Sequence, residues 1–247
     1  MRVKNYMKNL PYKYVALFYS HLMESIDYSV WGEYLADLIE GEGIKHPSIL
    51  ELSSGLGNLS DILSKKYRKI ICSDNSLDML LNFKNRKLPL ICFDMREIPI
   101  RRKFDVVLST FDSINYLLTY KDIVKHLKSV KNSLTKNGFY TFDASLELNS
   151  TKYAKLLNRK GEFEGVQYRQ RSFYDIIKKI HTNKFEITLP DGKKIQETHR
   201  QKIYPIETFF KAAEESGLYV QDCFNCFTFD NVNVKSERAQ FILRRID

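Results

Sequence analysis

The sequence predicts one α/β domain, built on a mostly parallel β-sheet with helices on both faces and carrying a small antiparallel β insert. Three observations support this prediction. Short apolar runs alternate with helical stretches from Pro47 to Asp143. These runs are apolar throughout, which is typical of parallel strands that are buried on both faces. From about Gly161 to Tyr204 the pattern changes to alternating strands around a tight turn, as in an antiparallel hairpin.

The parallel part of the sheet follows from the order of its segments. A helix is expected at Tyr28–Glu40, where Trp31, Leu35 and Leu38 recur at helical spacing ahead of the first strand. Strands are expected at residues 48–52, 69–73, 88–93, 104–109 and 139–143, with helices at residues 58–67, 76–83 and about 120–134. Strands that alternate with helices in this way form βαβ units, so we expect successive strands to lie parallel.

The insert and the C-terminal part complete the expected fold. Pro190-Asp191-Gly192 is a turn sequence between two alternating runs. A helix at residues 205–216 and strands at residues 217–224 and 237–245 are expected to close the large sheet with an antiparallel pair. No linker interrupts the sequence. We therefore predict a single domain over residues 1–247, in which about residues 150–203 form the antiparallel insert and cover the substrate.

The composition excludes several classes of protein. Hydrophobic residues make up 43% and charged residues 28% of the sequence, a globular composition that excludes a disordered chain. The longest apolar runs are strand-sized, far below the roughly 20 residues of a membrane-spanning helix, so no membrane partner is expected. The N-terminal region lacks the apolar core of a signal peptide, which predicts a cytoplasmic protein. Histidine and cysteine spacings match no zinc motif, so no metal is predicted.

The net charge of the sequence is +9, from 39 Lys and Arg residues against 30 Asp and Glu residues. The basic residues are spread along the chain in short groups and form no long block. This distribution favours an ordinary basic surface. It leaves open an acidic partner such as RNA, which is not the favoured interpretation.

A glycine-containing loop from Leu50 to Asn58 is the most informative stretch of the sequence. Gly55 and Gly57 stand between a predicted strand and a predicted helix. Glycines at this place let the backbone turn tightly and let a ligand approach where a Cβ atom would block it. A nucleotide-like ligand is one interpretation of the loop, and a plain strand-to-helix turn is the other.

Acidic residues end the next two predicted strands. Asp74 lies 19 residues after Gly55, where a carboxylate can accept hydrogen bonds from both hydroxyls of a ribose. Asp94 ends the following strand, and with Met95 it offers a carboxylate to an adenine amino group and an apolar side chain to the ring. The alternatives are a helix cap for Asp74 and a surface acid beside Arg96 for Asp94.

These motifs together resemble those of class I S-adenosylmethionine-dependent methyltransferases, particularly small-molecule enzymes with an antiparallel insert. A dehydrogenase would have a third glycine at Ser60, so a nicotinamide cofactor is not favoured. The resemblance covers nearly the whole chain and implies a doubly wound, Rossmann-like sheet of seven strands with S-adenosyl-L-methionine as the cofactor. The chain departs from the family at Ser53, where glycine is usual. A side chain there could crowd the methionyl moiety or donate it a hydrogen bond.

The resemblance also implies which residues surround the cofactor. Glu51, Ser53, Gly55 and Gly57 would line its methionine part, Asp74 and Asn75 its ribose, and Asp94 and Met95 its adenine, with Met79 and Ser109 completing the set. Tyr19 and Trp31 are expected as an aromatic lid, because a sulfonium ion is attracted to aromatic faces. Packing of an amphipathic helix explains Trp31 equally well.

The predicted reaction transfers a methyl group to a nitrogen or an oxygen of a small-molecule acceptor by in-line displacement. The protein has to align the acceptor with the methyl group and exclude water. A proton on the acceptor requires a base, and the candidates are Asp112 after the fourth strand and Glu197 or His199 from the insert. Alternatively, Asp112 is a turn residue, and Glu197 and His199 belong to an exposed strand.

Two other functions stay open at the level of sequence. An RNA or protein methyltransferase would use the positive charge of the chain, whereas a catalytically inactive binding protein would explain Ser53. The fourth strand ends in Ser109-Thr110-Phe111-Asp112 and lacks the Pro-Pro-aromatic motif of enzymes that methylate exocyclic base amines. This difference argues against a nucleobase amine as the acceptor.

Overall fold

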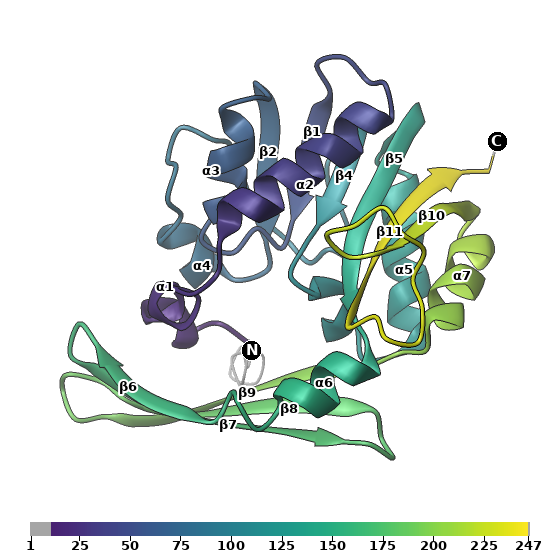
Figure 1. Ribbon diagram of the computed structural model, residues 1–247. Coiled ribbons are helices and arrows are strands. Elements are labelled where there is room, and N and C mark those ends of the chain that lie inside the picture. Colours follow the sequence, from purple (N-terminus) through teal and green to yellow (C-terminus); the bar gives the residue numbers. More distant parts are fainter. Residues whose placement is uncertain (1–10, 247) are drawn as a thin grey trace, which may run out of the picture.

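The computed structural model describes residues 11–246, which form two β-sheets, helices on both faces of the larger sheet, and an N-terminal segment between the sheets (Figure 1). The larger sheet has seven strands in the order β10-β11-β5-β4-β1-β2-β3. The smaller sheet has four strands in the order β6-β7-β8-β9. The predicted fold class, a doubly wound and mostly parallel sheet with an antiparallel insert, is therefore confirmed.

The seven-stranded sheet consists of a parallel part and an antiparallel edge. The parallel strands are β1 (Ser48–Leu52), β2 (Lys69–Asp74), β3 (Leu90–Cys92), β4 (Phe104–Ser109) and β5 (Leu134–Ser145). β11 (Arg238–Arg245) pairs antiparallel with β5, and β10 (Leu218–Asn225) pairs antiparallel with β11. β1 lies between β2 and β4 and is buried along its whole length. This burial explains the apolar residues Ile49, Leu50 and Leu52 of the strand.

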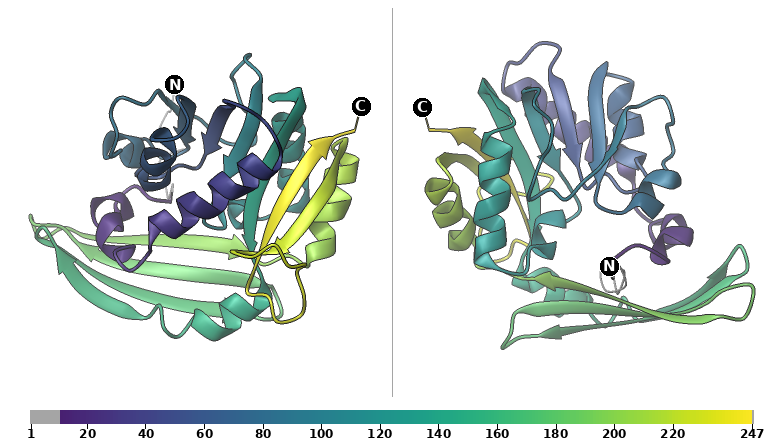
Figure 2. Two further views of the ribbon diagram at one scale, coloured as in Figure 1. Left: turned by 45° about the horizontal axis from the view of Figure 1, so that its top comes forward. Right: turned by 180° about the vertical axis from the view of Figure 1, so that it is seen from behind.

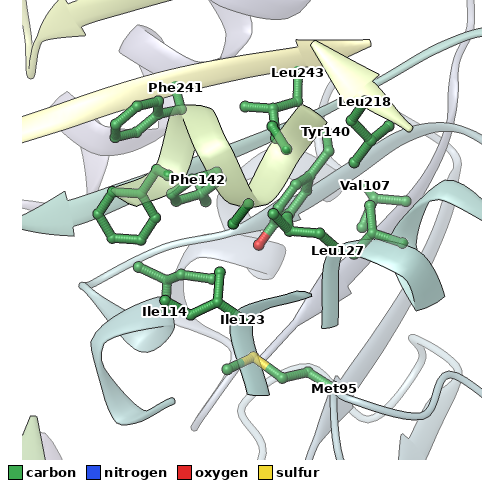
Figure 3. Close-up of a cluster of buried hydrophobic side chains, with 14 of the residues drawn as sticks. Met95, Val107, Ile114, Ile123, Leu127, Tyr140, Phe142, Leu218, Phe241 and Leu243 are labelled. Carbon is green, nitrogen blue, oxygen red and sulfur yellow. The ribbon is translucent and has the colours of Figure 1, made fainter. Parts of the chain in front are cut away.

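Helices cover both faces of this sheet. α2 (Tyr28–Gly41) and α3 (Asn58–Ser64) pack on one face, and α5 (Tyr120–Lys131) and α7 (Ile206–Glu215) pack on the other (Figure 1). Figure 3 shows part of the second core, which includes Leu127 of α5, Tyr140 and Phe142 of β5 and Phe241 of β11. The short helix α4 (Leu77–Leu81) follows β2, and α6 (Glu147–Tyr153) follows β5.

The four-stranded sheet packs one of its faces against the N-terminal segment. Its strands are β6 (Arg159–Phe163), β7 (Val166–Asp175), β8 (Ile180–Thr188) and β9 (Lys194–Lys202). The segment contains a 3-10 turn, η1 (Val15–Leu17), and the short helix α1 (Tyr19–Leu22). Phe18 between them stacks on Tyr168 of β7 with ring centroids 4.5 Å apart. As Figure 2 shows, this places the segment between the two sheets.

The predicted elements differ from the structure mainly at their ends. β5 begins at Leu134, earlier than the predicted strand, because Leu134 already pairs with Phe104 ahead of a shift in register. β3 is shorter than the predicted strand at residues 88–93, because it lies at the edge of the sheet and pairs only over Leu90–Cys92. The sequence predicts no helix where α6 lies.

None of the helices within residues 11–246 is long and apolar enough to cross a membrane.

Candidate active site

A cavity of about 330 Å³ opens at the carboxyl ends of the parallel strands, the place where open α/β sheets bind ligands. Many residues that the sequence predicts around the cofactor line this cavity: Tyr19, Glu51, Ser53, Gly55, Asp74, Asn75, Met79, Asp94 and Met95. Trp31, Gly57 and Ser109 lie outside the lining formed by the described residues. The glycine loop and the acids at two successive strand ends therefore meet at one cavity.

The loop after β1 adopts an unusual backbone conformation. Ser53, Gly55 and Gly57 all have positive φ angles, of 55°, 56° and 76°. This left-handed region favours glycine, which gives a physical reason for the family's glycine at the position of Ser53. The Ser53 hydroxyl donates a hydrogen bond to Met95 Sδ at 3.6 Å. The hydrogen-bond partner of the Ser53 hydroxyl is therefore the Met95 side chain, another residue of the cavity lining.

The carboxylate of Asp74 connects the glycine loop to the end of β2. Its Oδ2 accepts a hydrogen bond from the Gly55 amide at 2.8 Å, and its Oδ1 accepts one from the Ser76 amide at 2.8 Å. Burial raises the pKa of Asp74 above its ordinary value, although these amide donors oppose the shift. The N-cap of α4 is Ser76, whose hydroxyl accepts from the Met79 amide at 3.2 Å. Asp74 is thus free to meet a ligand with its remaining lone pairs.

Glu51 is a second carboxylate on the cavity wall. It belongs to β1, its side chain is buried, and the Ser60 hydroxyl donates a hydrogen bond to its Oε2. Burial raises the pKa of Glu51 to about 8, because the cavity wall solvates its charged form poorly. Glu51 is therefore mostly protonated at pH 7, and a cation next to it would favour its ionised form.

Asp94, Arg96 and Asp122 form a cluster of charged side chains on the cavity wall after β3. Arg96 donates to both oxygens of Asp94, with Nε 3.0 Å from each, and Arg96 Nη1 lies 2.8 Å from Asp122 Oδ1. Burial alone would raise the pKa of Asp94, but the hydrogen bonds from Arg96 outweigh it and lower that pKa below its ordinary value. Asp94 is therefore ionised and held in one orientation. The contact with Arg96 is also the one expected if Asp94 is a surface acid, the alternative that the sequence left open.

A chain of hydrogen bonds leads from the cavity wall into the four-stranded sheet. Tyr116 and Tyr12 both line the cavity, with their hydroxyl oxygens 2.6 Å apart. The Tyr116 hydroxyl lies 3.2 Å from His199 Nδ1, and His199 Nε2 lies 2.7 Å from Glu197 Oε1. The His199 and Glu197 side chains are only 3% and 4% exposed. Both residues are therefore buried on the inner face of β9, contrary to the interpretation as an exposed strand.

Glu197 also holds the N-terminal segment in place. Its carboxylate accepts hydrogen bonds from the backbone amides of Tyr12, Tyr14 and Val15 at 2.5, 2.8 and 3.3 Å. Burial raises the pKa of Glu197, but hydrogen bonds from His199 and from these amides outweigh it and lower that pKa overall. Because Tyr12 and Tyr19 line the cavity, an ionised Glu197 keeps this aromatic cover closed over it.

Sequence reasoning missed Tyr12 and Tyr116 as site residues. Tyr116 follows the loop after β4, in η2 (Ser113–Tyr116), so its place after a strand end was an available signal. Nothing in the sequence around Tyr12 indicates its contact with Tyr116, because that contact joins segments 104 residues apart. The two tyrosines add hydroxyl groups to a cavity lining that also contains the apolar side chains of Met79 and Met95.

Asp112 and Trp31 lie beside the cavity lining. Asp112 Oδ1 forms an ion pair with Arg238 at 2.7 Å, and its Oδ2 accepts a hydrogen bond from Gln201. Trp31 is 6% exposed and packs against Phe111, with ring centroids 4.5 Å apart. Asp112 therefore fixes the turn after β4, and Trp31 supports that turn from α2.

Comparison with known proteins agrees with this site. Residues 49–138 match a family described as a methyltransferase domain. The putative methyltransferase YqeM of Bacillus subtilis is 28% identical over 240 residues, which cover 93% of this chain and 95% of that protein. An S-adenosylmethionine-dependent methyltransferase structure from Clostridium acetobutylicum has a TM-score of 0.76 at 22% identity, with 94% and 98% of the two chains covered. The sugar N-methyltransferase KedS8 from Streptoalloteichus has a TM-score of 0.74 at 18% identity, with 99% and 98% covered.

The chain therefore has the fold of class I S-adenosylmethionine-dependent methyltransferases, and residues 49–138 match a methyltransferase domain. The structure from Clostridium acetobutylicum is described as S-adenosylmethionine-dependent, so the cavity can be compared with the groups of S-adenosyl-L-methionine. The cavity residues fit this molecule: Asp74 and Asp94 offer carboxylates for hydroxyl and amino groups, and Glu51 offers one for an ammonium group. Gly55 leaves open space within 4 Å of the position that a Cβ atom would take, so the backbone is accessible to a ligand.

The two glycines of the loop give a test of the loop geometry. A Cβ atom on Gly57 would come within 2.2 Å of the Phe83 ring, whereas on Gly55 it would meet nothing within 4 Å. Both residues have left-handed backbones, which cost an L residue roughly 1–2 kcal/mol. Gly57→Ala should therefore lower the free energy of unfolding in urea by about 3 kcal/mol, and Gly55→Ala by about 1 kcal/mol. Equal losses in the two variants would contradict the described contact with Phe83.

Proposed function

We propose that this enzyme transfers the methyl group to a nitrogen or an oxygen of a small-molecule acceptor by in-line displacement. The observation that carries the proposal is the hydrogen-bond chain that ends at Tyr116 on the cavity wall. A buried and directed proton acceptor suits a methyl acceptor that loses a proton from an N–H or O–H group. The similarity of the fold to the sugar N-methyltransferase KedS8 supports the same class of acceptor.

The size and the cover of the cavity support a small acceptor. At about 330 Å³ it is at the lower end of small-molecule pockets, and the N-terminal segment covers it with Tyr12 and Tyr19. A folded RNA or protein would have to displace this segment, which three hydrogen bonds to Glu197 hold in place. We therefore favour a small molecule over the macromolecular acceptors that the positive charge left open.

We assign the binding of the methyl donor to the strand ends. Glu51, Ser53 and Gly55 would hold its methionine part, Asp74 and Asn75 its ribose, and Asp94 and Met95 its adenine. When bound, S-adenosyl-L-methionine supplies an activated methyl group on a sulfonium sulfur. The protein's contribution is to hold the acceptor in line with that group and to exclude water, for which Tyr12 and Tyr19 form the cover.

The hydrogen-bond chain would remove the acceptor's proton. Glu197 is ionised and can only accept hydrogen bonds, so His199 donates to it from Nε2–H, and Nδ1 is left to accept a hydrogen bond from Tyr116. Burial raises the pKa of the Tyr116 phenol well above its ordinary value, so the phenol keeps its proton until His199 takes it. Tyr116 then accepts the proton of the acceptor as it passes its own proton to His199, and Glu197 stabilises the resulting imidazolium.

This assignment gives different roles to the predicted catalytic residues. Tyr116 touches the acceptor and is the catalytic residue, and His199 is the proton acceptor behind it. Asp112, whose carboxylate is committed to Arg238 and Gln201, positions the turn after β4. Its φ angle of 50° places that turn in the left-handed region, where the ion pair offsets the backbone cost.

An acceptor screen tests the proposed reaction. The enzyme is incubated with S-adenosyl-L-methionine and a panel of amines, amino sugars and phenols, and methylated products are detected by mass spectrometry. With the best acceptor, Tyr116→Phe and His199→Gln should lower kcat by about 100-fold or more.

The control for the screen is Tyr174→Phe. This variant removes the phenol of a β7 tyrosine that donates a hydrogen bond to Glu147 and does not line the cavity. It should retain the wild-type kcat. All variants should bind S-adenosylhomocysteine as the wild type does. Methylation of RNA or protein without turnover of any panel member, or an unchanged kcat in Tyr116→Phe, would overturn the proposal.

Glu51 gives a pH-dependent test of the donor site. In the free enzyme the pKa of Glu51 is about 8, so the carboxyl group is protonated at pH 7. The ammonium group of S-adenosylhomocysteine favours the ionised carboxylate and lowers that pKa, so binding should release about one proton at pH 7. Calorimetry in buffers of different ionisation enthalpy measures this release. Glu51→Gln should bind without it, and an equal proton release in both proteins would contradict the assigned contact.

A further inference from the structure

The four-stranded sheet has a second face that the site does not use. Along β7 the side chains alternate between buried and exposed from Val166 to Phe173. The buried set packs toward the N-terminal segment, and the exposed set forms the outer face, which points away from the seven-stranded sheet in both views of Figure 2. This outer face, carried by β6 to β9, is solvent-exposed in the chain as described.

Basic residues form a ladder across this outer face. Lys160 lies directly opposite Arg169 between β6 and β7, and Arg171 lies directly opposite Lys184 between β7 and β8. Arg200 of β9 is exposed on the same face. It pairs with Thr182, which lies two residues from Lys184 along β8. Like charges directly opposite each other destabilise a sheet, so two such neighbouring pairs are unfavourable for the folded protein alone.

Glu186 lies directly opposite Arg169, and Glu162 is exposed on the same face, but the five basic residues of the ladder outnumber these two acids. Arg171 reaches Glu186 at 3.7 Å, whereas Lys160, Arg169, Lys184 and Arg200 make no ion pair with any residue of the described chain. The ladder is therefore complementary to an extended anion. A second copy of this chain would bring the same sign of charge to the face and be repelled.

An aromatic side chain lies at one end of the ladder. Phe173 is 46% exposed on the same face, and Lys184 Nζ lies 5.4 Å from its ring centroid. Basic side chains that follow a phosphate backbone, together with an exposed ring on which a base can stack, are the usual components of a single-strand binding surface. An acidic protein would need an apolar centre in the interface, and Phe173 is the only large apolar side chain exposed within the ladder's rungs on the described strands.

We propose that the outer face of the four-stranded sheet binds single-stranded RNA. Lys160, Arg169, Arg171, Lys184 and Arg200 contact the phosphates, and Phe173 stacks on a base. The exposed amide of Gln196, opposite Glu186 on the same face, is available to a ribose 2′-hydroxyl. Because the cavity lies on the other side of this sheet, the RNA binds without reaching Tyr116. The surface is a docking site that is separate from methyl transfer.

The test uses fluorescence anisotropy with a labelled oligouridine of about 20 nucleotides, titrated with the full chain at several salt concentrations. The triple variant Arg169→Gln/Arg171→Gln/Lys184→Gln removes three charges from the ladder. The control Arg101→Gln/Lys121→Gln/Lys128→Gln removes three exposed charges that lie outside the four-stranded sheet. Both variants therefore have the same net charge.

The ladder variant should bind the RNA at least tenfold more weakly than the wild type, with the slope of log K against log salt reduced by about 2, since each phosphate contact contributes about 0.7. The control should stay within twofold of the wild type. Phe173→Ala should weaken binding about fivefold or more, because stacking contributes about 1–3 kcal/mol per base. All three should bind S-adenosylhomocysteine normally, which separates this proposal from the proposed function.

Four results would overturn the proposal. Equal weakening in the ladder and control variants would indicate an effect of net charge alone. Unchanged binding in the ladder variant would place any RNA site elsewhere. Equal affinity for polyglutamate of the same length would indicate a general attraction to polyanions. Binding to phosphatidylglycerol vesicles but not to the RNA would assign the face to an anionic lipid surface.

Discussion

The carboxylate of Asp74 is the interaction on which the site depends. With its two oxygens it fixes the Gly55 amide of the loop after β1 and the Ser76 amide ahead of α4. These two loops form adjoining walls of the cavity. Hydrogen bonds to a carboxylate are stronger than those between neutral groups, and here they are partly shielded from water. One half-buried acid therefore connects two strand ends and still has lone pairs for a ligand.

A second carboxylate, that of Glu197, holds the cover of the cavity in place. It binds three backbone amides of the N-terminal segment, and the same carboxylate orients His199. Tyr12 connects the two systems: its amide donates to Glu197, and its carbonyl accepts a hydrogen bond from the Ser76 hydroxyl at 3.2 Å. The large sheet, the small sheet and the segment between them are thus joined at the cavity. One carboxylate therefore both holds the cover and orients His199.

The sequence predicts those parts of the molecule that depend on local pattern. Fully apolar strands separated by helices define the sheet, and the carboxyl ends of parallel strands lie at one edge. That is enough to bring Gly55, Asp74 and Asp94 to one cavity. It also places Ser53, whose left-handed backbone explains why glycine is usual there, although the structure gives its hydroxyl a partner in Met95.

The remaining parts depend on contacts between distant segments. The hydroxyl of Tyr116 meets a histidine 83 residues away, and the Tyr12 amide meets a carboxylate 185 residues away. Asp112 looks like a free base in the sequence because its ion-pair partner, Arg238, belongs to the last strand. Alternation along β9 permits either face to be buried, so only the packing of the N-terminal segment decides that Glu197 and His199 point inward.

The most direct test of the account is the affinity for S-adenosylhomocysteine of Asp74→Asn, measured by calorimetry beside the neighbouring control Asp78→Asn. Hydrogen bonds to a charged group contribute about 1.5–3 kcal/mol, so Asp74→Asn should weaken binding at least tenfold. Asp78→Asn should remain within twofold of the wild type. Wild-type affinity in Asp74→Asn would contradict the claim that this carboxylate organises the adenosine site.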